Sequence, residues 1–292
     1  MATLTSSQAQ QSEALTQAFK ATENRQAAKI AAGVALWYQQ RVNVEDPSTI
    51  EAWLNFVVSK IIGGSDAGAR RAARYYDASR RIEVPRGPAY AATASLGMVD
   101  EGVRQSLLVQ GPYAVVNRTA KINRLDIPPA QAKILIGKAK QESIRAVAAS
   151  TIRHTQAGGR QTIFENSKED RVALGWIRVT RAKPCAFCAM LSSRGIQYRP
   201  FTEDSFADSD TRFTGDGNAK VHDECGCSLK PVWTEHDPIL ETSESFLDMW
   251  NEFSFGSGRE AILNFRLGYD HFQETGVRLT PDQIAARRGN SS

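Results

Sequence analysis

The sequence contains little cysteine and little histidine, and it has no long hydrophobic run. Of its 292 residues, four are cysteine and four are histidine. No apolar segment approaches the roughly 20 residues that a helix needs to cross a bilayer. Residues 1–17 lack the basic start and apolar centre of a signal peptide. We therefore expect a reducing, cytoplasmic environment, in which a framework of structural disulfides is disfavoured.

Two catalytic signatures are also missing. The sequence has no Gly-x-Ser-x-Gly elbow of the serine hydrolases. It also lacks the Ser-Thr-Ser strand and the Glu-x-Glu pair of ADP-ribosyltransferases. The only histidines available as a general base are His154, His222, His236 and His271.

Ser257, between two glycines, is a weak candidate for a nucleophile. It is better explained as a helix cap, because Glu260 follows three residues later. His154 is expected to be exposed near the C-terminal end of a helix, where a positive charge is favourable. The catalytic residues of any enzyme activity therefore remain unknown at this level.

The net charge of +4 hides an uneven distribution along the chain. Residues 1–160 contain 21 Lys and Arg against 12 Asp and Glu, whereas residues 161–292 contain 15 against 20. A basic half is compatible with an anionic partner such as DNA. An ordinary solvated helical surface explains the same pattern, because no stretch forms a polybasic tail. Five arginines are the first candidates for a DNA contact: Arg70, Arg71, Arg74, Arg80 and Arg81.

Hydrophobic periodicity predicts helices in the first half of the chain. Apolar residues recur at helical spacing in residues 21–42 and 48–62. Ser48 and Glu51 predict the start of the second helix, and Gly63-Gly64 predict its end before another helix at 65–81. A helix is expected at 99–110, and Pro128-Pro129 open a long one that Gly158-Gly159 should close. Residues 113–127 have no clear preference.

The second half mixes strands with helices. Alternation predicts a half-buried strand at 176–180 and a second strand at 228–233. Residues 200–221 are acidic and rich in turn formers, which is typical of a long loop. We predict an α+β fold in three parts. Residues 1–157 form a mostly helical domain, residues 158–235 a small Cys/His-containing module, and residues 236–292 a helical tail.

All four cysteines lie in that short module. They form the pattern C-x2-C, then 33 residues, then H-x2-C-x-C. A tetrahedral zinc site needs four sulfur or nitrogen ligands, and this pattern offers five candidates. The candidates are Cys185, Cys188, His222, Cys225 and Cys227. Cys185 and Cys188 with two of the other three would bind Zn²⁺ most economically.

Other interpretations of the cysteines remain open. Cysteine is often buried as a small apolar residue, so four packed thiols need no metal. A thioredoxin-like redox pair is disfavoured, because no βαβ pattern follows the C-x-x-C turn. A cysteine protease would leave two thiols without a role.

These motifs resemble the phage head-morphogenesis family. The relevant runs are 173-ALGWIRVTRAKPCAFCAMLSSRGIQY-198 and 222-HDECGCSLKPVW-233. They are similar to the MuF-like minor capsid proteins, especially the branch from phages of actinobacteria. The same cysteine and histidine spacing occurs in that family. The similarity covers roughly residues 150–233 well, is loose over the N-terminal helices, and gives no guide beyond residue 235.

The resemblance implies a role in building the phage head. A few copies would associate with the portal, capsid or scaffold proteins, in the virion or procapsid assembled in the host cytoplasm. Members of this branch are often named capsid maturation proteases, so a protease cleaving capsid or scaffold protein is the alternative. A stand-alone regulatory zinc module is a third possibility. No membrane association is expected.

Overall fold

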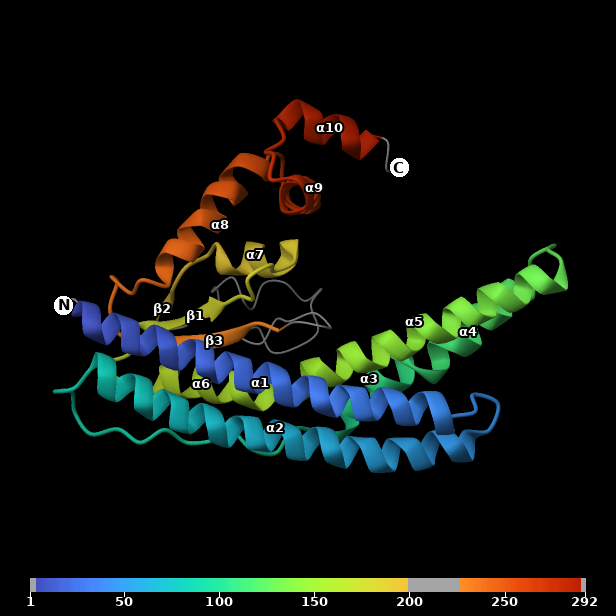
Figure 1. Cartoon of the computed structure of the whole chain (residues 1–292), viewed down its shortest axis with the longest axis horizontal. Helices are drawn as coiled ribbons and strands as arrows, with labels where there is room; N and C mark the ends of the chain where they lie inside the picture. The colour runs from blue at the N-terminus through green and yellow to red at the C-terminus, as the bar shows by residue number, and fades with distance from the viewer. Residues whose placement is uncertain (1–3, 199–225, 290–292) are drawn as a thin grey trace.

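The computed structural model describes residues 4–198 and 226–289. It begins with two long helices, α1 (Ser6–Arg41) and α2 (Pro47–Glu83), which lie side by side (Figure 1). α1 starts at a capping box, because the Gln8 N–H donates to the Thr5 hydroxyl and the Thr5 N–H donates to the Gln8 side chain. The helix predicted from residue 21 therefore begins about four turns earlier.

Two glycines lie inside α2 rather than at its end. The predicted stop at Gly63-Gly64 is wrong, because α2 continues to Glu83. The predicted cap at Ser48 is also wrong, because the Asp46 side chain caps the helix. A Cβ atom at Gly64 would lie 2.4 Å from Ile30 Cδ1 and 3.0 Å from Thr155 Cγ2. This glycine therefore serves close helix packing and not helix termination.

Four further helices complete the first half of the chain. They are α3 (Asp100–Gln110), α4 (Pro112–Ile122), α5 (Pro129–Thr155) and α6 (Ala157–Glu169). The predicted helices at 99–110 and from Pro129 are confirmed, and the ambiguous segment from 113 folds as α4. A core between α1, α2, α3 and α5 includes Val34, Tyr38, Trp53, Leu54, Val57, Ile61, Val103, Leu107 and Val147.

Gly158 and Gly159 do not close the long helix. α5 ends at Thr155, and both glycines belong to α6. The Gly158 N–H donates to Ser65 Oγ at 2.9 Å, and a Cβ atom there would lie 2.5 Å from the Ser65 carbonyl oxygen. The glycine thus allows α6 to approach α2 closely, which local sequence signals do not reveal.

A small antiparallel sheet follows α6. Its strands are β1 (Gly175–Val179), β2 (Gln197–Tyr198) and β3 (Ser228–Val232), in the order β2-β1-β3. The register pairs Gly175 with Val232 and Val179 with Ser228. Both predicted strands are confirmed to within about one residue. Every residue of β1 and β3 is buried, so the expected half-buried strand is in fact covered on both faces.

The two faces of the sheet meet different neighbours. Trp176 and Leu229 pack against α1, α2 and α6, in a cluster that includes Phe19, Tyr75, Ile163 and Phe164. Ile177 and Val232 pack on the other face, where Ile196, Ile239 and Leu240 contact them. Figure 1 shows the sheet between the α1–α6 layer and the helices that follow it.

The remaining described helices form a second hydrophobic cluster. They are α7 (Ala186–Ser192), α8 (Leu240–Phe253), α9 (Arg259–Thr275) and α10 (Pro281–Gly289). Their cluster includes Ala189, Met190, Phe246, Met249, Phe253, Phe265, Tyr269 and Ile284. α8, α9 and α10 lie in the segment where the sequence predicted helices. The predicted cap at Ser257 is wrong, because α9 has Gly258 at its N-cap and no side-chain cap.

The described chain therefore has a mostly helical layout with one small sheet, which agrees with the α+β class at a coarse level. His222 and Cys225, which would complete a Cys/His module, lie outside the described residues. None of the described helices is long and apolar enough to cross a membrane.

Candidate functional site

The C-x-x-C turn forms the start of α7. Cys185 has an extended backbone at the N-cap position, and its Sγ accepts a hydrogen bond from the Cys188 N–H at 3.5 Å. Its carbonyl accepts from the Ala189 N–H at 3.0 Å. Cys188 is buried, while Cys185 is half-buried. The first cysteine thus caps the helix that positions the second.

The third described cysteine comes from the other strand. Cys227 precedes β3, which pairs antiparallel with β1 and places Ser228 opposite Val179. The chain leaves β1 at Val179 and reaches Cys185 a few residues later, so Cys227 arrives beside the turn. Cys185, Cys188 and Cys227 form one cluster with Phe187. The structure brings together three of the five predicted ligands.

The metal prediction is left open by this arrangement. In residues 4–198 and 226–289, no group of three or more histidine, cysteine and acidic side chains is placed so as to hold a metal ion. The other two predicted ligands, His222 and Cys225, lie outside those ranges. The three thiols nevertheless supply the soft sulfur donors that Zn²⁺ prefers.

Two polar side chains flank the cysteine cluster. The Tyr269 hydroxyl on α9 donates to the Pro184 carbonyl at 3.1 Å and so holds the turn before Cys185. Burial raises the pKa of Tyr269, and negative charge on the nearby thiols raises it further. The Lys20 amine on α1 donates to the Thr180 carbonyl at 2.6 Å. Burial lowers the pKa of Lys20, and the nearby Cys227 opposes that shift.

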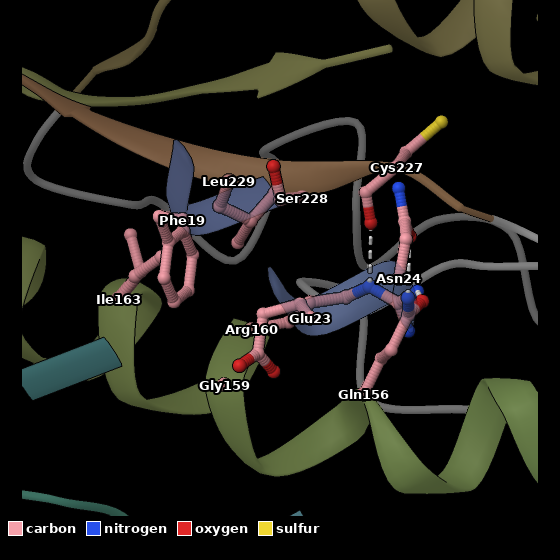
Figure 2. Close-up of a pocket in the computed structure, with 10 residues that line it drawn as sticks. All are labelled: Phe19, Glu23, Asn24, Gln156, Gly159, Arg160, Ile163, Cys227, Ser228 and Leu229. Atoms are coloured by element: carbon pink, nitrogen blue, oxygen red, sulfur yellow. Dashed lines mark hydrogen bonds between the residues drawn. The ribbon is translucent and has the colours of Figure 1, made fainter. Parts of the chain in front are cut away.

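Arg160 fixes the backbone at Cys227. Its Nε donates to the Cys227 carbonyl at 3.0 Å, and its Nη2 donates to Gln156 Oε1 at 2.5 Å. Gln156 in turn donates to Asn24 Oδ1 at 2.7 Å. Figure 2 shows these side chains around a small cavity, with the sulfur of Cys227 pointing away from it. The cavity has a volume of about 10 Å³, which is room for roughly one water molecule, so it is not a substrate pocket.

A buried ionic network joins the helices to the sheet. Lys230 on β3 donates to Glu83 Oε1 at 2.8 Å and to Asp237 Oδ2, and Ser12 on α1 donates to the same Glu83 oxygen. The Glu83, Lys230 and Asp237 side chains are 0%, 1% and 4% exposed. Burial alone would lower the pKa of Lys230. The attraction of the Glu83 and Asp237 carboxylates is larger than this effect, so the pKa of the amine is raised above its ordinary value. Lys230 is therefore a charged structural residue and not a neutral base.

A second buried network centres on Asp170. Arg80 Nε donates to Asp170 Oδ2 at 2.8 Å, and Trp233 Nε1 donates to the same oxygen at 3.1 Å. Burial alone would raise the pKa of Asp170, but hydrogen bonds from Arg80 and Trp233 lower it below its ordinary value of 3.8. The sequence placed Arg80 among the DNA-binding candidates, whereas the structure gives it this internal partner.

The remaining arginine candidates divide into two groups. Arg71 Nε contacts Glu23 Oε1 at 2.6 Å, so this side chain also has an internal role. Arg70, Arg74 and Arg81 are exposed on α2 and stay available to an external partner.

The candidate protease residues are not brought together where the structure describes them. His154 is partly buried rather than exposed, and its Nε2 lies 3.1 Å from Arg153 Nη2. Burial, reinforced by that guanidinium, lowers the pKa of His154 to about 4. Ser257 is exposed on the loop before α9. His271 contacts Thr275 and Arg287, and His222 is not described.

The described residues define a mostly helical protein with a small internal sheet. Its buried polar side chains connect the helices to the sheet region through ion pairs and hydrogen bonds. The model of the VG15 protein family matches residues 6–253, so the chain belongs to the VG15 family. The chain is also 26% identical over 211 residues to the Gene 15 protein of Mycobacterium phage D29, covering 64% of this chain and 67% of that protein.

These similarities identify a phage-related protein. No solved structure matches the chain.

Proposed function

We propose that this chain is a head assembly protein of a tailed phage, a MuF-like minor capsid protein that associates with the portal and capsid. The clustering of Cys185, Cys188 and Cys227 carries the proposal. Three of the residues on which the resemblance to head-morphogenesis proteins depends pack together, with Cys188 and Cys227 buried and Cys185 half-buried beside them. This is the behaviour of a structural signature and not of a reactive site. Membership of the VG15 family and the phage relative also support the proposal.

Assembly of procapsids provides the test. The phage's own portal, scaffold and capsid proteins would be co-expressed with and without this chain, and purified particles analysed by quantitative mass spectrometry. The proposal expects a small, reproducible number of copies that remain with the particle and with the isolated portal. If the chain is absent from every particle and from the portal fraction, the proposed role in the virion or procapsid is wrong.

The same particles distinguish the alternative, a capsid maturation protease. Proteolysis would shorten the capsid or scaffold chain only when this protein is present. His154 gives little support to that chemistry, because a general base works best with a pKa near the operating pH, and the pKa of His154 is about 4. If shortened chains appear, alanine substitution of His154, His222 and Ser257 would test these candidates, and cleavage that survives all three would point to other residues.

A structural zinc ion is part of the proposal. Cys185 and Cys188 with two of His222, Cys225 and Cys227 would supply the four ligands, which would close the site without an open catalytic position. Metal analysis of protein purified without chelator should find about one zinc per chain. Replacing Cys188 by serine should abolish that zinc, whereas zinc below about half an equivalent in the unmodified chain would contradict the site.

DNA contact through the basic N-terminal half is a further element of the proposal. The exposed residues Arg70, Arg74 and Arg81 are now the preferred candidates. Binding to duplex DNA should fall steeply as salt rises, because phosphate contacts release counterions. Reversal of Arg70 and Arg74 to glutamate should weaken binding, and an absence of binding even at low salt would exclude this contact.

A further inference from the structure

The end of α4, the following loop and the start of α5 form an arm that contributes nothing to the core. We define this arm as residues 116–138. Val115 and Ala139, which flank it, are 2% and 4% exposed, whereas every residue between them is at least partly exposed. Figure 1 shows the two helices extending together beyond the end of the neighbouring helices. An arm in which no residue is fully buried is well suited to contact another chain.

The surface of the arm combines apolar and basic side chains. Val116, Leu125 and Ile134 are 45%, 53% and 60% exposed. The span contains one acidic residue, Asp126, and five basic ones, all exposed: Arg118, Lys121, Arg124, Lys133 and Lys138.

Two of these lysines lie close to the most exposed apolar residue. Ile134 and Lys138 are four residues apart on α5 and so share a face, with Lys133 adjacent. Neither lysine has an ion pair with any residue that the structure describes, whereas Arg118 pairs with Glu142. The Ile134 region therefore offers an apolar centre with unneutralised positive charge around it.

The outer face of α8 has the opposite charge. Glu241, Glu244 and Asp248 are exposed at positions i, i+3 and i+7, which places them on one side of the helix. Leu247 lies beside them and is 42% exposed. α8 contains no lysine or arginine, and these three acidic residues form no ion pair within the described part of the chain. The face is thus acidic with an apolar side chain at its edge.

The arm and the α8 face lie at different ends of the molecule (Figure 1), so they do not meet within one chain. We propose that the arm of one copy docks on the outer face of α8 in a second copy. Ile134 would pack against Leu247, while Lys133 and Lys138 would face Glu244 and Asp248. Such a contact joins two different surfaces, so it propagates from copy to copy and produces a ring or an open chain of subunits.

A second copy fits the arm better than a nucleic acid does. Phosphate contacts would use the lysines but would leave Leu125 and Ile134 without an apolar neighbour. The α8 face offers both the charges and the apolar residue. Opposite charges across the rim of an interface mainly steer association and set its specificity, and exposed ion pairs add little affinity. We therefore expect weak, salt-sensitive association.

Charge reversal on both surfaces tests the contact. The full-length chain would be studied by analytical ultracentrifugation across a concentration series at about 50 mM and about 500 mM salt. The distance over which exposed charges interact is severalfold shorter at the higher salt concentration. The unmodified chain should self-associate at low salt and dissociate at high salt. K133E/K138E and E244K/D248K should each weaken association roughly tenfold or more, and the chain that carries all four substitutions should associate again.

The matched control is R25E/K29E, which reverses two exposed basic residues on α1 and changes the net charge by the same amount as K133E/K138E. It should leave association unchanged, and circular dichroism would confirm that all variants are folded. The proposal is overturned if the unmodified chain is monomeric throughout, if the control acts like K133E/K138E, or if the fourfold variant does not recover. Loss of duplex DNA binding in K133E/K138E without any self-association would assign the arm to nucleic acid instead.

Discussion

Replacing Lys230 by methionine would remove the only cation of the most deeply buried ionic network in the described chain. The Lys230 ammonium donates to Glu83 and Asp237, and all three side chains are at most 4% exposed. Methionine approximates the length of the lysine side chain but carries no charge. The variant would therefore leave two carboxylates next to each other with no counter-charge, in the region that joins α2 to β3.

The expected loss is large because a buried charge without its partner cannot recover its solvation. Breaking a buried pair by removing one member costs about 3–5 kcal/mol. In a chain of this size that corresponds to a drop in melting temperature of roughly 10 °C. Burial raises the pKa of Glu83 above its ordinary value of 4.5, while Lys230 opposes the shift. Without Lys230 the pKa of Glu83 rises further.

The sign of the pH dependence follows from that shift. A carboxyl whose pKa is raised in the folded state stabilises the fold below its unfolded pKa, and this contribution is lost as pH rises through the folded pKa. The deficit of Lys230→Met relative to the unmodified chain should therefore be smaller near pH 5 than near pH 8. The double variant Lys230→Met/Glu83→Gln should regain part of the lost stability, because it removes one of the two unpaired charges.

Urea unfolding followed by tryptophan fluorescence at the two pH values measures these differences. The control is Lys29→Met, since Lys29 is an exposed lysine on α1, and its effect should stay within about 0.5 kcal/mol. A deficit below about 1 kcal/mol near pH 8, or an equal deficit at both pH values, would refute the assigned role of the network.

Three further predictions concern packing and protonation. Gly158→Ala should lower the free energy of unfolding by about 1–3 kcal/mol through overpacking. Gly137 has open space around it, so Gly137→Ala should be neutral or stabilise the fold by up to about 1 kcal/mol. Equal effects of the two substitutions would contradict the close approach of α6 to α2 at Gly158. NMR titration should find His154 with a pKa of about 4, and a value near 6.5 would mean that its ring is solvated. Arg80→Met should raise the pKa of Asp170 and destabilise the fold near pH 7, with a deficit that shrinks below about pH 4; a constant deficit would exclude the ion pair as its cause.

Much of the secondary structure follows from local signals in the sequence. Pro128-Pro129 correctly marked the start of α5, and alternation found β1 and β3. Apolar residues at helical spacing likewise indicated parts of α1 and α2. These predictions succeeded because helix starts and residue periodicity depend on neighbours only a few positions away.

Glycine pairs misled the same reasoning. Gly63-Gly64 and Gly158-Gly159 look like helix ends, yet both pairs lie within helices. Gly64 lets α2 approach α1 and α5, and Gly158 lets α6 approach α2, whereas Gly63 has open space around it. The local sequence around a glycine is the same whether that glycine ends a helix or allows another helix to pack closely. The two cases therefore cannot be distinguished from the sequence.

The buried charges were beyond local reasoning for a similar reason. Arg80 looked like a surface arginine, and Lys230 is a lone lysine inside a short strand. Their partners are 90 and 147 residues away along the chain, at Asp170 and Glu83. No periodicity or short motif links residues at such separations, so these networks could not be predicted from one sequence.

The sequence alone determined the coarse class of the chain, the positions of both longer strands and the grouping of all its cysteines in one region. Tertiary structure decided that Cys185, Cys188 and Cys227 actually meet, because only the antiparallel pairing of β1 with β3 brings the second cysteine run back to the C-x-x-C turn. The tertiary structure also decided which charged residues face solvent and which form buried ion pairs. Residue spacing along the chain indicates which side chains could act together, whereas burial and pairing depend on which distant segments the fold brings into contact.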